Sequence, residues 1–334
     1  MSGIPQTFLR EAHPAGSLNE TLRIGGSRFW LRVCGLSKET QLSFPLGRHL
    51  PHDTTNLLQA SDIEIFAMQS EAAARELNTL RQDEELNCQN ANGNIVYCHD
   101  GYVDLSHPIG QPIPLALTDP RHIDGQGALN VAVAAALTHT GGIVLHACAF
   151  QFNDKGIVAI AVSGIGKSTL AAAVIGSGGC VISDDSVLIA PSLANDHFAS
   201  PFRHNMSLRH GALQLLNPQQ QKQLHRIDTG KEEKWFIARD DFEEAFIDKL
   251  KVDELWLLTP PSSATLPQKQ PLSAAASLVG LMASNFYLTA NQPSLRNHAT
   301  QATLALTNSL PCYQVNLTQR LLEAPEKTLA YLLP

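Results

Sequence analysis

The sequence predicts an α/β protein with a small, mostly β domain at its N-terminus. Three observations support this fold class. A strand, a Gly-rich loop and a helix follow one another over residues 157–175. Short runs with alternating apolar and polar residues recur before residue 120. From residue 250 onward, strand-like runs alternate with helical ones, as in sheets covered by helices. We therefore expect a mostly β domain over 1–120 and an α/β domain over 121–334.

In the N-terminal domain the sequence predicts short strands separated by turn residues. They are residues 22–33, with a turn at Gly25 and Gly26, and residues 61–67, 94–98 and 101–105. Residues 70–86 are rich in Glu, Ala, Arg and Leu and predict a helix. Four prolines in residues 106–121 indicate a connector to the second domain.

The C-terminal domain alternates clear helices and strands. We expect strands over 143–152, 157–162, 180–183, 250–258 and 312–317, and helices over 127–138, 167–175, 272–286, 292–309 and 318–332. The first two strands form a hairpin through a turn at residues 153–156. A turn of that length pairs residues whose numbers sum to 309, and this register sets His146 opposite Ser163.

Composition and charge exclude several classes of protein. Lys and Arg number 24 against 31 Asp and Glu, a net charge of −7, which disfavours general binding to nucleic acid. No uninterrupted apolar stretch is long enough to span a bilayer, so no membrane partner is expected. The N-terminus lacks a basic flank before an apolar core, and the six cysteines form no CxxC pair. These features predict a cytoplasmic protein with reduced thiols.

Residues 161–169, AVSGIGKST, predict a phosphate-binding loop. Glycines let successive backbone N–H groups turn toward phosphate oxygens, and the following helix N-terminus adds partial positive charge. Lys167 can reach the β- and γ-phosphates, and the Ser168 hydroxyl can bind Mg²⁺. The alternative is a Gly-rich turn that binds nothing. We expect the nucleotide to contact Ala161, Ser163, Gly164, Ile165, Gly166, Lys167, Ser168 and Thr169.

Two adjacent carboxylates, Asp184 and Asp185, end the strand that follows the loop helix. Ligands of open α/β sheets bind at the carboxyl ends of strands, where the loop also lies. Phosphoryl transfer requires a base for the attacking hydroxyl and a metal on the phosphates, and two neighbouring carboxylates could supply both. A solvent-exposed Asp-Asp turn is the alternative. His146 could contact the phosphate site. The commoner alternative is a histidine buried in the core with its hydrogen bonds satisfied by the backbone.

The segments LHACAF, AVSGIGKST and VISDD resemble the catalytic domain of HPr kinase/phosphorylase and related serine kinases. The resemblance covers residues 140–190 and implies a P-loop α/β domain related to the ATP-dependent phosphoenolpyruvate carboxykinases. It implies that Asp184 is the base, that Asp185 and Ser168 lie at Mg²⁺, and that His146 lies beside the γ-phosphate.

Three departures indicate a divergent member of this family. Thr169 stands where the family has Glu, and the family's Arg-Gly-Leu-Gly stretch and Arg-rich C-terminal segment are missing. The chain is more similar to kinases that accompany ribosomally made, modified peptides. Arg203 and Arg209 are candidate phosphate clamps, with surface arginines as the alternative. Residues 229–235 predict a charged loop that could bring Lys231 or Lys234 to the substrate.

Together these features predict an ATP- and Mg²⁺-dependent serine kinase that acts on a protein or peptide. A nucleotide-binding regulatory module without turnover and a kinase of free serine remain alternatives. The acceptor, a homo-oligomeric state and a reverse phosphorylase reaction are left open by the sequence.

Overall fold

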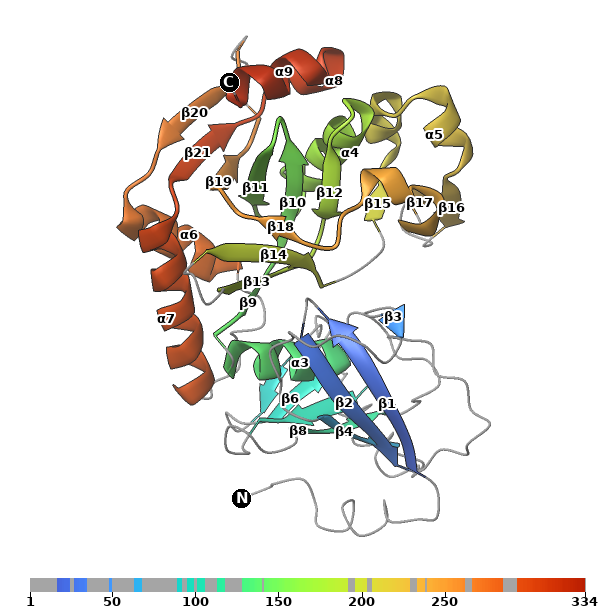
Figure 1. Ribbon diagram of the computed structural model, residues 1–334, viewed down its shortest axis with the longest axis vertical. Helices are drawn as coiled ribbons and strands as arrows, with labels where there is room; N and C mark the ends of the chain where they lie inside the picture. The colour runs from blue at the N-terminus through green and yellow to red at the C-terminus, as the bar shows by residue number, and fades with distance from the viewer. Residues whose placement is uncertain are drawn as a thin grey trace. The chain divides into compact units, whose positions relative to one another are not determined.

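The computed structural model describes most of the chain after residue 127 and separate segments before it (Figure 1). The described residues are 17–24, 27–34, 48–49, 63–67, 89–91, 95–98, 101–105, 113–117, 128–139, 141–191, 196–202, 206–228, 233–237, 239–261, 266–284 and 293–333. The chain forms two compact units. The first contains residues 1–142 and 287–299, and the second contains residues 143–286 and 300–334.

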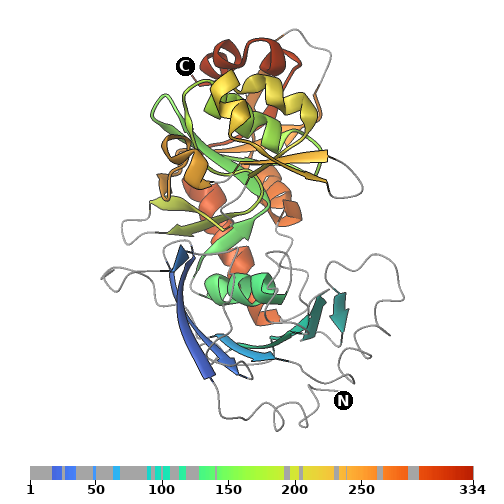
Figure 2. The same ribbon diagram turned by 90° about the vertical axis from the view of Figure 1, so that its right-hand side faces the viewer.

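One eight-stranded sheet makes up most of the described part of the first unit, with strand order β3-β1-β2-β4-β8-β7-β6-β5 (Figure 2). Its strands are β1 (Ser17–Ile24), β2 (Ser27–Cys34), β3 (Arg48–His49), β4 (Ile63–Ala67), β5 (Gln89–Ala91), β6 (Ile95–Cys98), β7 (Gly101–Asp104) and β8 (Ile113–Leu117). The hairpin expected with a turn at Gly25 and Gly26 is confirmed, because β1 pairs with β2 in antiparallel register. The strands expected over 94–98 and 101–105 are β6 and β7, which also pair in antiparallel register. The helix expected over 70–86 lies outside the described residues.

Helix α3 (Ala128–His139) belongs to the first unit, so the division falls after Gly142 and not at the expected 120/121. The helix contacts β6, β7 and β8 of the eight-stranded sheet. Every side chain from Val131 to Leu137 is buried. The sequence of a helix that is apolar around its whole circumference predicts that the helix is buried, but it does not indicate which sheet the helix packs on. Its sequence therefore carried no signal for the domain that contains it.

Three sheets form the second unit. The strand orders are β12-β10-β11-β19-β21-β20, β18-β14-β13-β9 and β15-β17-β16. The six-stranded sheet contains β10 (Ala147–Phe152), β11 (Lys155–Ile160), β12 (Cys180–Ser183), β19 (Glu254–Thr259), β20 (Gln268–Pro271) and β21 (Cys312–Asn316). The four-stranded sheet contains β9 (Ile143–Leu145), β13 (Val187–Pro191), β14 (His197–Pro201) and β18 (Leu250–Lys251). The three-stranded sheet contains β15 (Met206–Leu208), β16 (His225–Asp228) and β17 (Glu233–Ile237).

The helices of the second unit are near their expected positions, except α5, which was not expected from the sequence. They are α4 (Lys167–Gly176), α5 (Pro218–Lys222), α6 (Ala274–Ser284), α7 (Pro293–Ser309), whose first turns fall in the first unit, α8 (Arg320–Glu323) and α9 (Pro325–Leu332). Short 3₁₀ helices are η1 (His210–Leu215), η2 (Arg239–Asp241) and η3 (Glu243–Ala245). The single helix expected over 318–332 is two helices, since Pro325 starts a new first turn.

The chain passes from one sheet to another at two neighbouring points. The apolar run 143–152 was expected to be one strand, but His146 separates β9 of the four-stranded sheet from β10 of the six-stranded sheet. Residues 184–186 separate β12 from β13 in the same way. The Ala147 N–H donates to the Asp185 carbonyl at 3.0 Å, which holds the two crossings side by side.

The β10–β11 hairpin has a different register from the expected one. Ala147 pairs with Ile160 and Phe152 pairs with Lys155, so the paired numbers sum to 307 and not 309. The turn is two residues long, because Asn153 and Asp154 adopt positive φ angles of 49° and 61°, as type I′ turns require. A shift of two residues keeps each side chain on the same face of the sheet.

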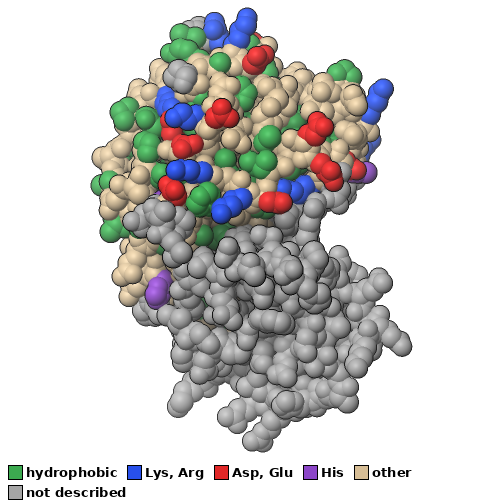
Figure 3. Space-filling model, in the orientation of Figure 1, with side chains coloured by type: hydrophobic (Ala, Val, Ile, Leu, Met, Phe, Trp, Pro, Cys, Tyr) green, Lys and Arg blue, Asp and Glu red, His purple; other side chains and the backbone are tan. Residues whose placement is uncertain are grey.

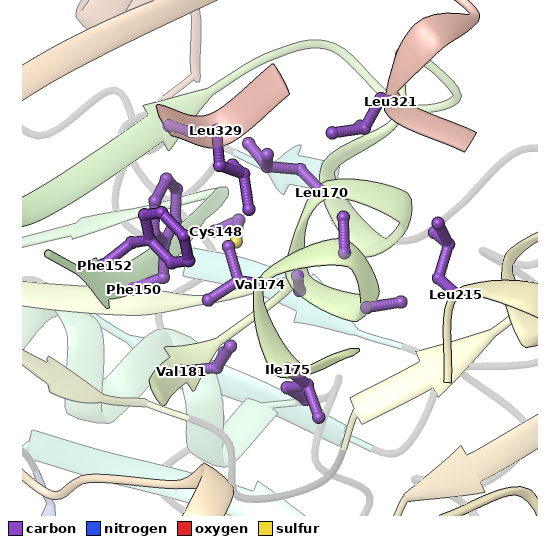
Figure 4. Packing of buried hydrophobic residues seen from close by; sticks show 14 of the residues in the cluster. Cys148, Phe150, Phe152, Leu170, Val174, Ile175, Val181, Leu215, Leu321 and Leu329 are labelled. Carbon is purple, nitrogen blue, oxygen red and sulfur yellow. The ribbon is translucent and has the colours of Figure 1, made fainter. Parts of the chain in front are cut away.

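Helix α4 lies at the centre of the larger apolar cluster of the second unit (Figure 4). Its side chains from Leu170 to Ile175 are buried. They pack among residues of β10, β12, η1 and the C-terminal helices, including Phe150, Leu215 and Leu329. The packing around α4 fixes the direction of its N-terminus, from which the functional site is built.

Gly156 was expected in the turn, but it lies in β11, where β18 approaches closely. A Cβ on Gly156 would lie 1.8 Å from the Lys251 carbonyl oxygen. We expect Gly156→Ala to lower the free energy of unfolding by about 1–3 kcal/mol, because backbone must move to admit the methyl group. Thermal denaturation measures this, with Gly211→Ala as control, since a Cβ there meets nothing within 4 Å. Equal melting temperatures for the two variants would contradict the close approach.

Basic and acidic side chains are interspersed on the face of the second unit shown in Figure 3. Such a mixed surface differs from the continuous basic face that nucleic-acid binding uses. Within the described ranges, none of the helices has the length and apolar character needed to cross a bilayer.

Candidate functional site

The predicted glycine loop joins the end of β11 to the start of α4, as expected from the motif. Gly164 and Gly166 have φ angles of 85° and 117°, a region that residues with a Cβ rarely adopt. A Cβ would meet nothing within 4 Å at either position, so these glycines serve the backbone conformation and not close packing. Gly166 is the N-cap of α4 without a side-chain cap. The loop therefore leads directly into an uncapped helix N-terminus, which favours anions.

Lys167 is buried at the base of the loop, with 6% of its surface exposed. Its Nζ donates to the Ala161 carbonyl at 2.7 Å and to the Val162 carbonyl at 3.4 Å. Burial lowers the pKa of this lysine, and the nearby carboxylates of Asp185 and Asp184 act in the opposite direction. The ammonium group is thus held under the loop, next to the position where an anion would bind.

Asp184 is a buried carboxyl group of the site with a raised pKa. It directly follows β12 with 3% of its surface exposed, and its Oδ1 has no hydrogen-bond partner. Burial and the neighbouring charge of Asp185 raise its pKa to about 7, although polar groups of Ser168 and the Ser207 backbone lower it. An unpaired buried carboxylate oxygen costs stability and is a feature of sites that bind protons, metals or substrates.

The buried Asp184 carboxyl should make stability depend on pH. In the unfolded chain its pKa is the ordinary 3.8, so between about pH 4 and pH 7 the folded state holds a proton that the unfolded state has lost. Stability is therefore lost as pH rises through this range. We expect Asp184→Asn to raise the melting temperature by several degrees above about pH 8 and by much less near pH 5. Thermal scans without Mg²⁺ or nucleotide measure this, and a pH-independent difference would contradict it.

Asp185 and His146 form a pair at the two sheet crossings. His146 Nδ1 lies 3.2 Å from Asp185 Oδ1, and both side chains are about one-third exposed. The Ser186 hydroxyl donates to the other Asp185 oxygen at 3.0 Å. Two groups therefore orient the Asp185 carboxylate, while it remains open to solvent.

These residues line one cleft of about 200 Å³. Its lining is polar on most sides and includes the loop, the two aspartates and part of the three-stranded sheet. The lining residues are His146, Ser163, Gly164, Gly166, Lys167, Ser168, Thr169, Asp184, Asp185, Ser207, Leu208, Arg209, Ala212 and Lys234.

Most of the residues expected at the site meet at this cleft. The 309 register was wrong, and His146 lies before the first β10–β11 pair, Ala147–Ile160. His146 and Ser163 nevertheless both line the cleft. Ala161 and Ile165 do not line the cleft; both pack against the core around α4. Arg203 lies outside the described residues.

Three cleft residues were not assigned to the site from the sequence: Ser207, Leu208 and Ala212. Ser207 lies in the short strand β15, and no motif indicated it. Lys234 was expected in a charged loop that could bring it to the substrate; it lies in strand β17 and lines the cleft. A lysine next to acidic residues resembles any solvated surface residue, and only the structure shows that Lys234 lines the cleft.

Comparison with known proteins adds little to this geometry. No family model and no curated protein sequence matches the chain. The solved structure of the Hpr(Ser) kinase/phosphatase from Coxiella burnetii is similar over 56% of this chain and 94% of that chain, with 14% sequence identity and a TM-score of 0.31. Because this likeness is too weak to support a conclusion on fold or activity, the function has to be inferred from the residues of the cleft.

Proposed function

We propose that the chain is an ATP- and Mg²⁺-dependent kinase that phosphorylates a serine hydroxyl of a protein or peptide. The supporting observation is the meeting of Lys167 and Ser168 with Asp184 and the Asp185–His146 pair in one cleft. Phosphoryl transfer needs groups that hold the phosphates, a metal site and a base close to one another. The cleft offers a residue for each of these tasks.

The residues present fit a bound Mg-nucleotide. The backbone of Gly164 and Gly166 can follow phosphate oxygens, and Lys167 can move its ammonium from the loop carbonyls to the β- and γ-phosphates. Ser168 and Asp185 would hold Mg²⁺, because hydroxyl and carboxylate oxygens are the ligands this ion prefers. Bound Mg²⁺ would neutralise charge on the phosphates.

Asp184 is the proposed base. Its pKa of about 7 lies close to neutral pH, where a general base works best, and its Oδ1 is available to accept a proton. In the transfer step Asp184 takes the serine hydroxyl proton as the serine oxygen bonds to the γ-phosphorus. The bond from that phosphorus to the bridging oxygen breaks, and ADP leaves. His146 orients Asp185 through the 3.2 Å contact.

The test is transfer of labelled γ-phosphate in the presence of Mg²⁺ to serine-containing peptides, to proteins and to free serine. Label on a serine hydroxyl of a peptide or protein supports the proposal. Nucleotide binding without transfer to any acceptor would instead identify a regulatory module. Transfer to free serine alone would identify a small-molecule kinase.

A further inference from the structure

Two cations lie near the end of β15, on the part of the three-stranded sheet that lines the cleft. β15 pairs with β17 as Met206↔Ile237, Ser207↔Phe236 and Leu208↔Trp235, so the paired numbers sum to 443. One step further along this register sets Arg209 opposite Lys234, since 209 + 234 = 443. Both residues line the cleft. Two cationic side chains on one wall of a cleft attract an anionic group of a ligand.

These cations are separate from the groups that hold the nucleotide in the proposed function. Lys167 and the glycine loop come from the β11–α4 connection, whereas Arg209 directly follows β15 and Lys234 lies in β17. Arg209 is exposed and Lys234 is partly exposed, so a ligand entering from solvent can reach them. The cleft thus has a second cationic wall, formed by a different sheet.

This wall is adjacent to the proposed base. The Ser207 backbone lies close enough to the Asp184 carboxyl to lower its pKa, and Ser207 is two residues from Arg209. An anionic group held by Arg209 and Lys234 would therefore lie near the hydroxyl that Asp184 deprotonates. Arginine and lysine both bind carboxylates, arginine through two parallel hydrogen bonds.

We propose, on the basis of the proposed kinase function, that Arg209 and Lys234 recognise a carboxylate of the acceptor beside its reactive serine hydroxyl. The carboxylate can come from an acidic residue flanking the serine in a peptide, or from free serine itself. Both sources present the same carboxylate group, and binding measured with matched pairs of ligands distinguishes a peptide from free serine.

The experiment measures acceptor binding by calorimetry, with the cleft saturated by Mg²⁺ and a non-hydrolysable ATP analogue. One pair of probes is a serine peptide flanked by aspartates and the same peptide flanked by alanines. The other pair is L-serine and serinamide, which lacks the carboxylate. We expect the carboxylate-bearing member of one pair to bind about tenfold more tightly. Lys234→Ala should remove most of this preference and leave nucleotide affinity unchanged.

Lys222→Ala is the matched control, because Lys222 is an exposed lysine of α5 outside the cleft. It removes the same charge and should preserve the preference. Equal affinities within both pairs for the wild type would overturn the inference. A large loss of nucleotide affinity in Lys234→Ala would also overturn it, because the lysine would then bind the nucleotide. A preference for L-serine over serinamide, without a preference between the peptides, would support the inference but contradict a peptide acceptor.

Discussion

The Asp184→Asn protein is expected to bind Mg-nucleotide at least as tightly as the wild type and to transfer phosphate roughly a hundred- to ten-thousand-fold more slowly. The amide keeps the shape of the side chain, but it cannot take a proton at neutral pH. The substitution also removes a negative charge close to the phosphate site, so it should not weaken nucleotide binding. Single-turnover transfer of labelled phosphate and calorimetry with nucleotide measure the two properties separately. Undiminished transfer would exclude Asp184 as the base.

Asp185→Asn should behave differently, although it changes the neighbouring residue by the same single charge. If Asp185 supports Mg²⁺, its loss raises the concentration of Mg²⁺ needed for half-maximal transfer and also slows turnover. Titration of Mg²⁺ for both variants separates the two roles. Because Ser168 lies near Asp184, a raised Mg²⁺ requirement in Asp184→Asn alone would reverse the assignment and make Asp184 the metal-binding carboxylate.

Short-range features of the site were accessible from the sequence. The glycine loop requires positive φ at Gly164 and Gly166, a conformation that few other residues adopt. The two glycines in the sequence therefore indicate this loop conformation. Helix α4 was expected over 167–175 and is observed over Lys167–Gly176. The strand expected over 180–183 is observed as β12, and the adjacent aspartates follow it directly. The burial of Asp184 was not visible in the sequence, because two acids after an apolar run favour an exposed end.

Long-range features were not accessible, because they depend on contacts between distant segments. The apolar run 143–152 is buried on both sides of His146, so its sequence does not show that β9 and β10 lie in different sheets. Gly156 resembles a turn glycine, but glycine is needed there because the carbonyl of Lys251, far along the chain, leaves no room for a Cβ. Lys234 lines the cleft from a strand that pairs with β15. In each case the deciding partner lies outside any local pattern.

Replacing Lys167 by methionine is expected to weaken Mg-nucleotide binding at least about tenfold, which corresponds to about 1.4 kcal/mol. Lys167 is buried, so truncation to alanine would leave a cavity in addition to removing the charge. Methionine keeps an unbranched apolar stem of similar length and removes the ammonium group. Calorimetry with Mg-ATP or a non-hydrolysable analogue measures the affinity. The loss should appear for the nucleoside triphosphate and be smaller for the nucleoside, which has no phosphate to contact.

The stability of the Lys167→Met protein has to be measured beside its affinity. In the absence of nucleotide, Lys167 donates to the carbonyls of Ala161 and Val162, and removing that donor costs about 1 kcal/mol of folding free energy. A modest fall in melting temperature is therefore expected and is separate from the loss of affinity. If the folded variant binds the triphosphate as tightly as the wild type, the ammonium does not contact phosphate. The loop would then be a structural turn, and the proposed kinase function would lose its main support.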